Sequence, residues 1–219
     1  MTGSFSAYDE QSSSANAAES ANLSSTKWII GKNVPWSVSW TDEQSYDLQL
    51  SNDFPGLVDL VQIQRQGVGA PRFSALHITR HRMGMARHLC HVCGKPTSRR
   101  DRYIFPIESG GFVIMPDEST RYAGNVPPVH FACARRAQQL CPHLSRAFAQ
   151  PIAFPSEESR LIQRTDVVPG MEAVAKTLPP NLKIVFTCYR LYGPRFSKRV
   201  AQLRQNQMSV VATPTDKRS

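Results

Sequence analysis

The sequence predicts an α+β fold whose centre is held together by a metal site. Two pairs of Cys or His residues, each with two residues between its members, lie in the middle third of the chain. Short aromatic and β-branched runs typical of strands lie on both sides of these pairs. Apolar residues recur at helical spacing near the C-terminus. We therefore expect a centre stabilised by a metal ion, with short strands on both sides of it in the sequence and a helix near the C-terminus.

Composition narrows the class of protein. The chain has 219 residues, of which 41% are hydrophobic, enough for a packed core, and a net charge of +9. It contains no run of 18 apolar residues and no secretory signal pattern, so we expect neither a membrane span nor secretion. Three of the five cysteines fall in the paired motifs, which favours a metal in the reducing cytoplasm over a disulfide framework.

The composition also indicates where the chain is ordered. Residues 1–26 hold eight serines and three acids but no Lys or Arg, so we expect a disordered tail. We expect one domain over residues 27–210, with the metal module at about 87–146 inside it. Residues 211–219 should form a frayed end.

The first ordered element should be a short strand. Trp36, Val38 and Trp40 alternate with two serines, and this period of two indicates one buried face. Pro35 favours an edge position or the start of the strand. The three tryptophans, which include Trp28, are more simply a satellite core than a ligand-binding platform.

The next segments alternate between apolar runs and turn signals. The apolar residues from Leu57 to Ile63 are compatible with a short helix or a buried strand. Residues 67–71 are typical of a loop. We expect a helix from Ser74, as its N-cap, to about His88, although Gly84 weakens this expectation.

Two further elements are expected after the central third. Residues 181–189 follow a Pro-Pro pair and are apolar and β-branched, which indicates a buried strand. Phe196, Val200 and Leu203 lie at helical spacing within residues 196–208, so a terminal amphipathic helix is expected.

The paired Cys and His residues carry the strongest chemical signal. Cys90 and Cys93 are followed by Gly94, so one tight turn can direct two sulfurs at a single ion. His130 and Cys133 repeat the spacing at the start of an alanine-rich helical pattern. Together they make a Cys₃His set, typical of structural zinc, and we expect one Zn²⁺ that contributes to folding. The competing interpretations are unrelated buried thiol pairs or a redox C-x-x-C.

The fourth ligand has alternatives. Cys141 lies two helical turns beyond Cys133, roughly 11–12 Å along a helix axis, which is too far to share an ion. Pro142 supplies a break that would permit it, so Cys141 or His143 stays open as a replacement for His130, which we favour.

Two other residues of these types need no metal. His91 lies between Cys90 and Cys93 and should face solvent or a partner. Cys188 lies in an apolar strand and is more simply a buried thiol.

The segment between the two pairs should form a hairpin. Residues 102–107 and 111–115 are apolar and β-rich and are joined by a turn that contains two glycines. The order of knuckle, hairpin and helix resembles the treble-clef zinc fingers from Cys90 to about His143. The long loop expected over residues 116–128 departs from that pattern. Residues 89–144 also resemble uncharacterised bacterial proteins with a C-x-x-C-G knuckle and a later Cys or His pair, a resemblance that implies no activity.

Basic residues form the remaining signal. Seven Lys or Arg against one acid lie between Arg80 and Arg102, and eleven against three lie between Arg160 and Ser219. These stretches could contact phosphates or form an ordinary solvated surface. No named nucleic-acid motif is present. The candidate nucleic-acid contacts are Arg80, Arg82, Arg87, Arg99, Arg100, Arg102, Lys198 and Arg199.

These features favour a zinc-stabilised binding or regulatory protein that docks DNA or RNA through a basic face. An acidic protein is the next candidate partner, as for a protein–protein adaptor. The alternative is a metal-dependent hydrolase or a nuclease-like enzyme, although the expected hairpin has no histidine and common catalytic motifs are absent. The sequence does not indicate an oligomeric state.

Overall fold

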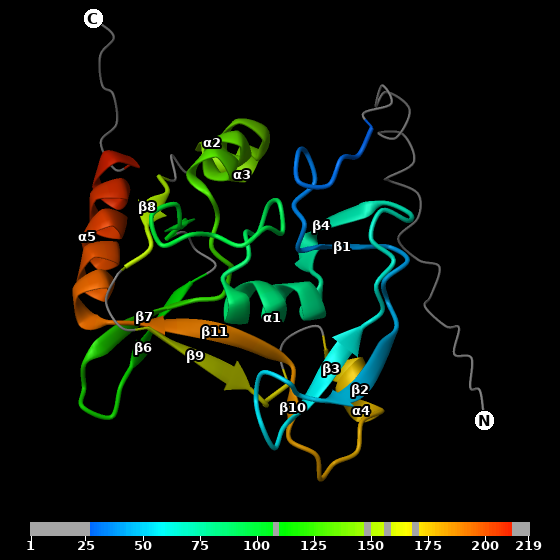
Figure 1. Ribbon diagram of the computed structural model, residues 1–219. Helices are drawn as coiled ribbons and strands as arrows, with labels where there is room; N and C mark the ends of the chain where they lie inside the picture. The colour runs from blue at the N-terminus through cyan, green and yellow to red at the C-terminus, as the bar shows by residue number, and fades with distance from the viewer. Residues whose placement is uncertain (1–26, 107–109, 147–149, 156–158, 168–170, 212–219) are drawn as a thin grey trace, which may run out of the picture.

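A computed structural model describes residues 27–106, 110–146, 150–155, 159–167 and 171–211. The expected N-terminal tail lies outside these residues, as does all but the first residue of the expected frayed end. Figure 1 shows the elements, which in chain order are β1 (Val38–Trp40), β2 (Tyr46–Leu50), β3 (Val58–Gln62), β4 (Pro71–Leu76), α1 (Ile78–Arg87), β5 (Tyr103–Ile104), β6 (Gly111–Ile114), β7 (Thr120–Gly124), α2 (Phe131–Leu140), α3 (Pro142–Arg146), β8 (Ile152–Ala153), β9 (Ser159–Arg164), α4 (Glu172–Lys176), β10 (Ile184–Val185), β11 (Thr187–Tyr192) and α5 (Pro194–Val211). The α+β class is confirmed.

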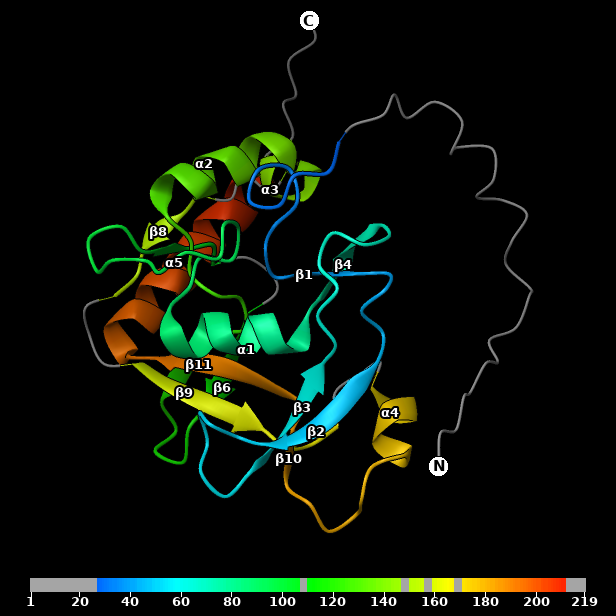
Figure 2. The same cartoon turned by 45° about the vertical axis from the view of Figure 1, so that its right-hand side comes forward.

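Two sheets and one helix make the frame. The larger sheet has the order β6-β7-β11-β9 and is antiparallel, and the smaller has the order β10-β3-β2. Helix α1 packs against β11 of the first sheet and β3 of the second, while α5 packs on β7. Figures 1 and 2 both show α1 lying across these sheets, with α2 and α3 beyond it on the opposite side. The remaining strands form the pairs β1–β4 and β5–β8.

The larger sheet buries one face, β11 against α1 and β7 against α5. Along β11 the side chains of Cys188, Arg190 and Tyr192 are buried, alternating with more exposed neighbours. Tyr192 packs with Tyr122 of β7 and with Phe196 of α5 in one apolar cluster. The expected buried strand and terminal helix are therefore confirmed, although the strand region divides into β10 and β11.

Buried arginines connect the elements. The Arg80 side chain, only 2% exposed, donates both terminal nitrogens to the Glu43 carboxylate at 2.7 Å. Arg82 donates to the carbonyls of Leu60 and Val185 at 3.0 and 3.1 Å, which joins β3 to β10. The structure does not present Arg80 and Arg82 to nucleic acid as predicted, because both side chains are buried and their terminal nitrogens donate hydrogen bonds inside the protein. Nε of Arg80 is buried without a hydrogen-bond partner among the described residues.

Other expectations are corrected by pairing. The apolar run after Pro55 is strand β3, which settles the choice between helix and strand. The helix begins at Ile78 rather than Ser74, because residues 71–76 pair with β1. In β1 the expected polar face is also buried, since Ser39 accepts a hydrogen bond from the Gln62 side chain at 2.9 Å.

The hairpin predicted from residues 102–107 and 111–115 does not form, because its two strands pair with other strands instead of with each other. Strand β5 pairs with β8, and β6 pairs with β7, which lies in the segment expected to be a loop. The turn between β6 and β7 is closed by a hydrogen bond from Met115 N to Ser119 O at 2.9 Å. The Asp117 carboxylate accepts from Ser119 N at 3.0 Å, a turn signal that the sequence analysis overlooked.

Gly84 has a low helix propensity, but the absence of a side chain there lets Pro127 pack closely against α1. A Cβ at this position would lie 2.8 Å from Pro127 Cγ. We expect Gly84→Ala to destabilise the protein by about 1 kcal/mol in urea unfolding, because an overpacking cost of about 1–3 kcal/mol exceeds the helix-propensity gain of about 1 kcal/mol. Gly111→Ala is the control, since nothing lies within 4 Å of its Cβ position. A more stable Gly84→Ala protein would contradict this packing.

His81 should make stability depend on pH. Burial lowers the pKa of its imidazole from 6.5 to about 4, and the charge of Arg82 acts in the same direction. The neutral ring lies 2.6 Å from the Asn125 carbonyl. Since the unfolded chain binds the proton more readily, this stability is complete above the unfolded pKa and is lost as pH falls towards 4.

We expect a loss of about 3 kcal/mol across this range, from 1.36 kcal/mol for each pKa unit. His81→Gln should show a shallower slope of unfolding free energy against pH than the parent protein. His143→Gln, at an exposed ring, is the matched control. Equal slopes for the parent protein and His81→Gln would exclude this role.

Candidate metal centre

The first pair of ligands lies in a tight knuckle. Cys90 N donates to Lys95 O, and Gly94 N donates to Cys90 O, both at 2.8 Å. Gly94 has a φ of +73°, and a Cβ there would lie 2.7 Å from the ring of Trp36. Glycine is therefore required for both the backbone conformation and the space.

The second pair lies at the start of α2. Val129 and Tyr103 exchange two backbone hydrogen bonds at 2.8 Å, which anchors the segment immediately before His130. His130 is the N-cap residue of α2, and Cys133 lies in its first turn. The Asp101 carboxylate accepts from Phe131 N at 2.7 Å and satisfies one of the free N–H groups at this helix end.

The four predicted ligands converge. The ligand atoms of Cys90, Cys93, His130 and Cys133 all lie within 4.8 Å of one another. His130 Nδ1 is 3.4 Å from Cys93 Sγ and 3.9 Å from Cys133 Sγ. Atoms bound to one tetrahedral zinc ion at ~2.3 Å would be ~3.8 Å apart. These four residues are therefore positioned to bind a metal ion.

A backbone carbonyl orients the imidazole of His130. Its Nε2 lies 3.1 Å from the carbonyl of Pro96, so this nitrogen donates and Nδ1 faces the sulfurs with its lone pair. A carbonyl on the distal ring nitrogen is a common support for metal-bound histidine.

Burial disfavours ionisation of the Cys90 and Cys133 thiols. Burial raises the pKa of Cys133 to about 12, and the neighbouring thiols Cys90 and Cys93 add to this rise. Burial also raises the pKa of Cys90. A divalent cation between the sulfurs reverses the balance, because metal ligation deprotonates thiols. Three thiolates and one imidazole are a donor set consistent with zinc.

The alternative ligands lie elsewhere. Among the described residues, Cys141 and His143 belong to no cluster of this kind. Cys141 is the C-cap residue of α2, at the opposite end from the ligands. Cys188 is a buried thiol, as expected, and burial raises its pKa to about 12.

The segment before β1 packs on the knuckle, a contact that the sequence analysis missed. Trp36 N donates to Val92 O at 2.8 Å, and Arg136 of α2 donates to Gly31 O at 3.1 Å. His91 does not point freely into solvent as expected, because its Nδ1 forms a hydrogen bond with the Ser37 hydroxyl. The segment before β1 therefore contacts both the knuckle and α2, the two parts of the chain that carry the candidate ligands.

The other candidate nucleic-acid contacts lie in different environments. Arg102 turns inward, donating to Thr97 O at 2.7 Å and lying over the Phe154 ring. Arg87 is exposed and lies 3.8 Å from the Asp53 carboxylate. The structure places four on the surface without an ion pair among the described residues, namely Arg99, Arg100, Lys198 and Arg199.

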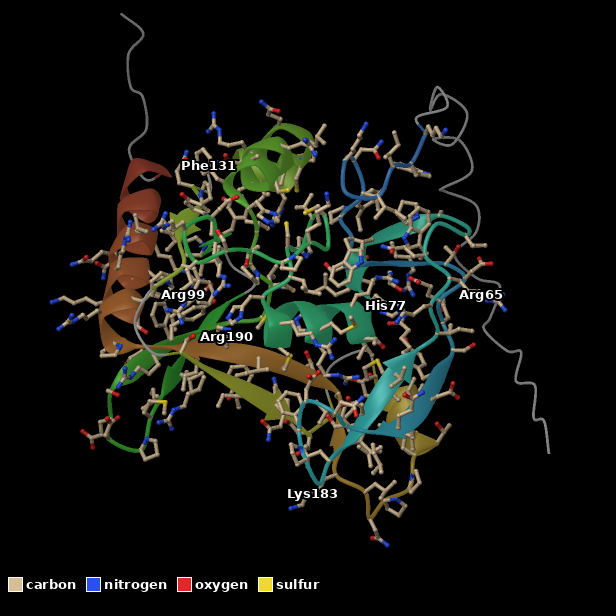
Figure 3. The ribbon with its side chains drawn as sticks, in the orientation of Figure 1. Arg65, His77, Arg99, Phe131, Lys183 and Arg190 are labelled. Carbon is tan, nitrogen blue, oxygen red and sulfur yellow. The ribbon has the colours of Figure 1, made fainter. Side chains whose placement is uncertain are left out.

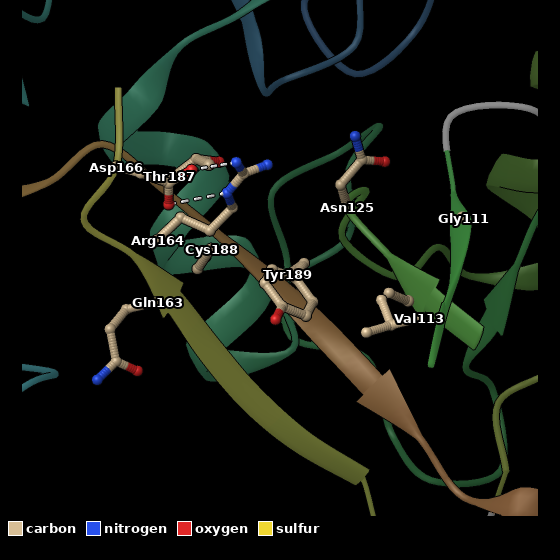
Figure 4. Close-up of a pocket in the computed structure, with 10 residues that line it drawn as sticks. Gly111, Val113, Asn125, Gln163, Arg164, Asp166, Thr187, Cys188 and Tyr189 are labelled. Carbon is tan, nitrogen blue, oxygen red and sulfur yellow. Dashed lines mark hydrogen bonds and ion pairs between the residues drawn. The ribbon is translucent and has the colours of Figure 1, made fainter. Parts of the chain in front are cut away.

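An open hollow of about 700 Å³ lies against the larger sheet (Figure 4). The Arg164 guanidinium in this hollow is paired with the Asp166 carboxylate, and the pair lowers the pKa of Asp166. Cys188 also contributes to the lining, but it is fully buried. The described residues of this hollow therefore present no activated nucleophile.

Comparison with known proteins adds no assignment: no protein-family profile, curated protein or solved structure matches the chain. The likeness to treble-clef fingers and to bacterial knuckle proteins gains no support from these comparisons. Within the described residues, no helix has the length and apolar character that crossing a membrane requires.

We expect the metal to depend on Cys133 and not on Cys141. Cys133→Ser should lose the ion and a large share of stability, because metal affinity in such sites is folding free energy. Cys141→Ser is the matched control and should keep one ion per chain. Elemental analysis and thermal melting with and without chelator measure both effects. Metal loss in Cys141→Ser but not in Cys133→Ser would overturn the ligand assignment.

Proposed function

We propose that the protein is a zinc-stabilised binding module. The observation that carries this proposal is the convergence of four protein ligands within 4.8 Å. A Cys₃His shell is closed, as in structural zinc sites, whereas a catalytic zinc keeps one position for water or substrate. The enzyme alternative requires such a position.

A treble-clef-like frame is part of this proposal. The knuckle with Cys90 and Cys93 is followed by the β6–β7 hairpin and then by α2, which carries the second pair. This order is that of treble-clef fingers, although β5 lies between the knuckle and the hairpin and pairs with β8.

We further propose that residues 27–210 form one folding unit. Side chains of α1 reach both ends of the chain: Arg80 donates to Val38 O and Arg82 donates to Val185 O. In the reverse direction, Arg190 of β11 donates to the carbonyl of Met85 in α1.

The binding surface we propose is smaller than the predicted basic face. It consists of the loop after the knuckle, with Arg99 and Arg100, and the outer face of α5, with Lys198 and Arg199. All four are exposed. Figure 3 places Arg99 on the side of the molecule where α5 lies. Exposed guanidinium and ammonium groups without ion-pair partners are suited to phosphate contacts, so nucleic acid is the partner we propose.

Salt dependence tests this function. We expect the zinc-loaded protein to bind random duplex DNA or single-stranded RNA, with affinity falling steeply between low and moderate salt as counterions are released. Replacing Arg99 and Arg100 by Gln should weaken binding and reduce the salt slope by about 1 for each phosphate that the variant no longer neutralises. Fluorescence anisotropy at several salt concentrations measures both quantities.

Lys176→Gln together with Lys183→Gln removes the same charge from exposed positions away from this surface. Binding that is absent at low salt would exclude the nucleic-acid function. An equal loss in the control variant would show a response to net charge rather than a defined surface. Retained binding to an acidic protein in place of nucleic acid would support the adaptor alternative.

A further inference from the structure

A second hollow, of about 760 Å³, lies beside the metal centre. It is bounded by the segment before β1, by β4, by the knuckle and by α2 with α3. Figures 1 and 2 both show the blue N-terminal segment passing close to α2 and α3. This volume is within the range of small-molecule sites, which span about 300–1,000 Å³.

The hollow lies between three separate hydrophobic clusters, each of which contributes residues to its wall. Tyr122 and Tyr192 on its wall belong to the cluster under α5, Val92 and Val129 to the cluster around the metal ligands, and Val38 to a third cluster. Each cluster is buried, yet the space between them is open. Protein interiors are packed without large voids, so an apolar space of this size indicates a place for another molecule.

The rim of the hollow is also apolar. Trp28 is 44% exposed, and Phe73 and Leu140 are each 55% exposed. The rings of Trp28 and Phe73 form an edge-to-face pair with centroids 5.7 Å apart. Large apolar groups that line a hollow and remain exposed at its opening are typical of a ligand-binding groove.

Charge at the hollow has one sign. Lys32 contributes to the lining and is exposed, and none of the described lining residues is an Asp or a Glu. Lys32 has no ion-pair partner among the described residues. An apolar space with a lone ammonium group is complementary to a molecule with an apolar body and an anionic end.

We propose that this hollow binds a single-chain amphiphile with an anionic head group, such as a medium- or long-chain carboxylate. The chain lies against the walls formed by Val92, Val129 and Leu144, and the head group contacts Lys32. This site does not use the residues of the proposed nucleic-acid surface, so either proposal can fail without the other.

The test uses full-length, zinc-loaded protein and dodecanoate below its micellar concentration. Calorimetric titration should show one dodecanoate per chain, while dodecyltrimethylammonium, with the same chain and the opposite charge, should bind more weakly. Lys32→Gln should weaken dodecanoate binding about threefold, the range of one exposed ion pair. Lys183→Gln, at an exposed lysine on another face (Figure 3), should leave it unchanged.

Filling the hollow gives an independent readout. Ala137 lies on the wall, so Ala137→Phe should abolish binding of both amphiphiles. Ala132→Phe, on the exposed side of the same helix, should preserve it. The zinc content of each variant reports whether the fold is retained, and the lysine variants keep the test valid if Ala137→Phe does not fold.

Several results would overturn the proposal. These are the absence of dodecanoate binding, a stoichiometry of many molecules per chain, or equal affinity for both head-group charges. Retained binding in a folded Ala137→Phe protein would place the ligand elsewhere, and an unchanged affinity in Lys32→Gln would remove the head-group contact.

Discussion

Three thiols and an imidazole share one small space, an arrangement that a bound cation would stabilise. Burial and mutual repulsion raise the pKa of Cys133 to about 12, so without a cation this thiol would keep its proton and could not act as a metal ligand. The ligands Cys93 and His130 are 37 residues apart, and a metal bond between them closes a long loop. Trp36 packs beside Gly94 of the knuckle, and Arg136 of α2 donates to Gly31 O, so further contacts join the two segments that the loop closure would connect.

Buried arginines form a second set of interactions that holds the fold together. They also account for part of the net positive charge. Arg80 and Arg82 are compensated by Glu43 and Asp59, although Asp59 Oδ1 lies 3.4 Å from Arg82 and has no hydrogen bond. Arg190 is buried, donates to the Met85 carbonyl and lies 5.8 Å from the centre of the Phe154 ring. Removing one member of such a pair leaves an uncompensated charge, so these residues restrict the way α1 can pack between the two sheets. Part of the basic composition therefore serves folding rather than recognition.

The parts predicted correctly from sequence were those encoded by local spacing. The C-x-x-C knuckle, the histidine three residues before Cys133 and the helical spacing in α5 each need only one short segment to be recognised. The errors arose where a residue's environment depends on contacts with segments that are distant in sequence. Nothing near Arg80 in sequence indicates that Glu43 is its partner, and nothing near Tyr103 indicates that Ala153 pairs with it. Gly84 illustrates the same limit, because its helix-weakening effect is local while its contact with Pro127 is not.

Helix α2 connects the metal centre to the apolar hollow. Cys133 is one of the four residues positioned to bind a metal ion, and Ala137, one turn later on the same face, contributes to the wall of the hollow. Val92 and Val129, each next to a ligand or between two ligands, also line that wall. A metal ion bound by these residues would therefore hold in place much of the surface that a ligand would contact. By reciprocity, any ligand that binds this wall only when the metal is in place must strengthen retention of the metal by the same factor. Binding at the two proposed sites would then be coupled through one helix and one knuckle.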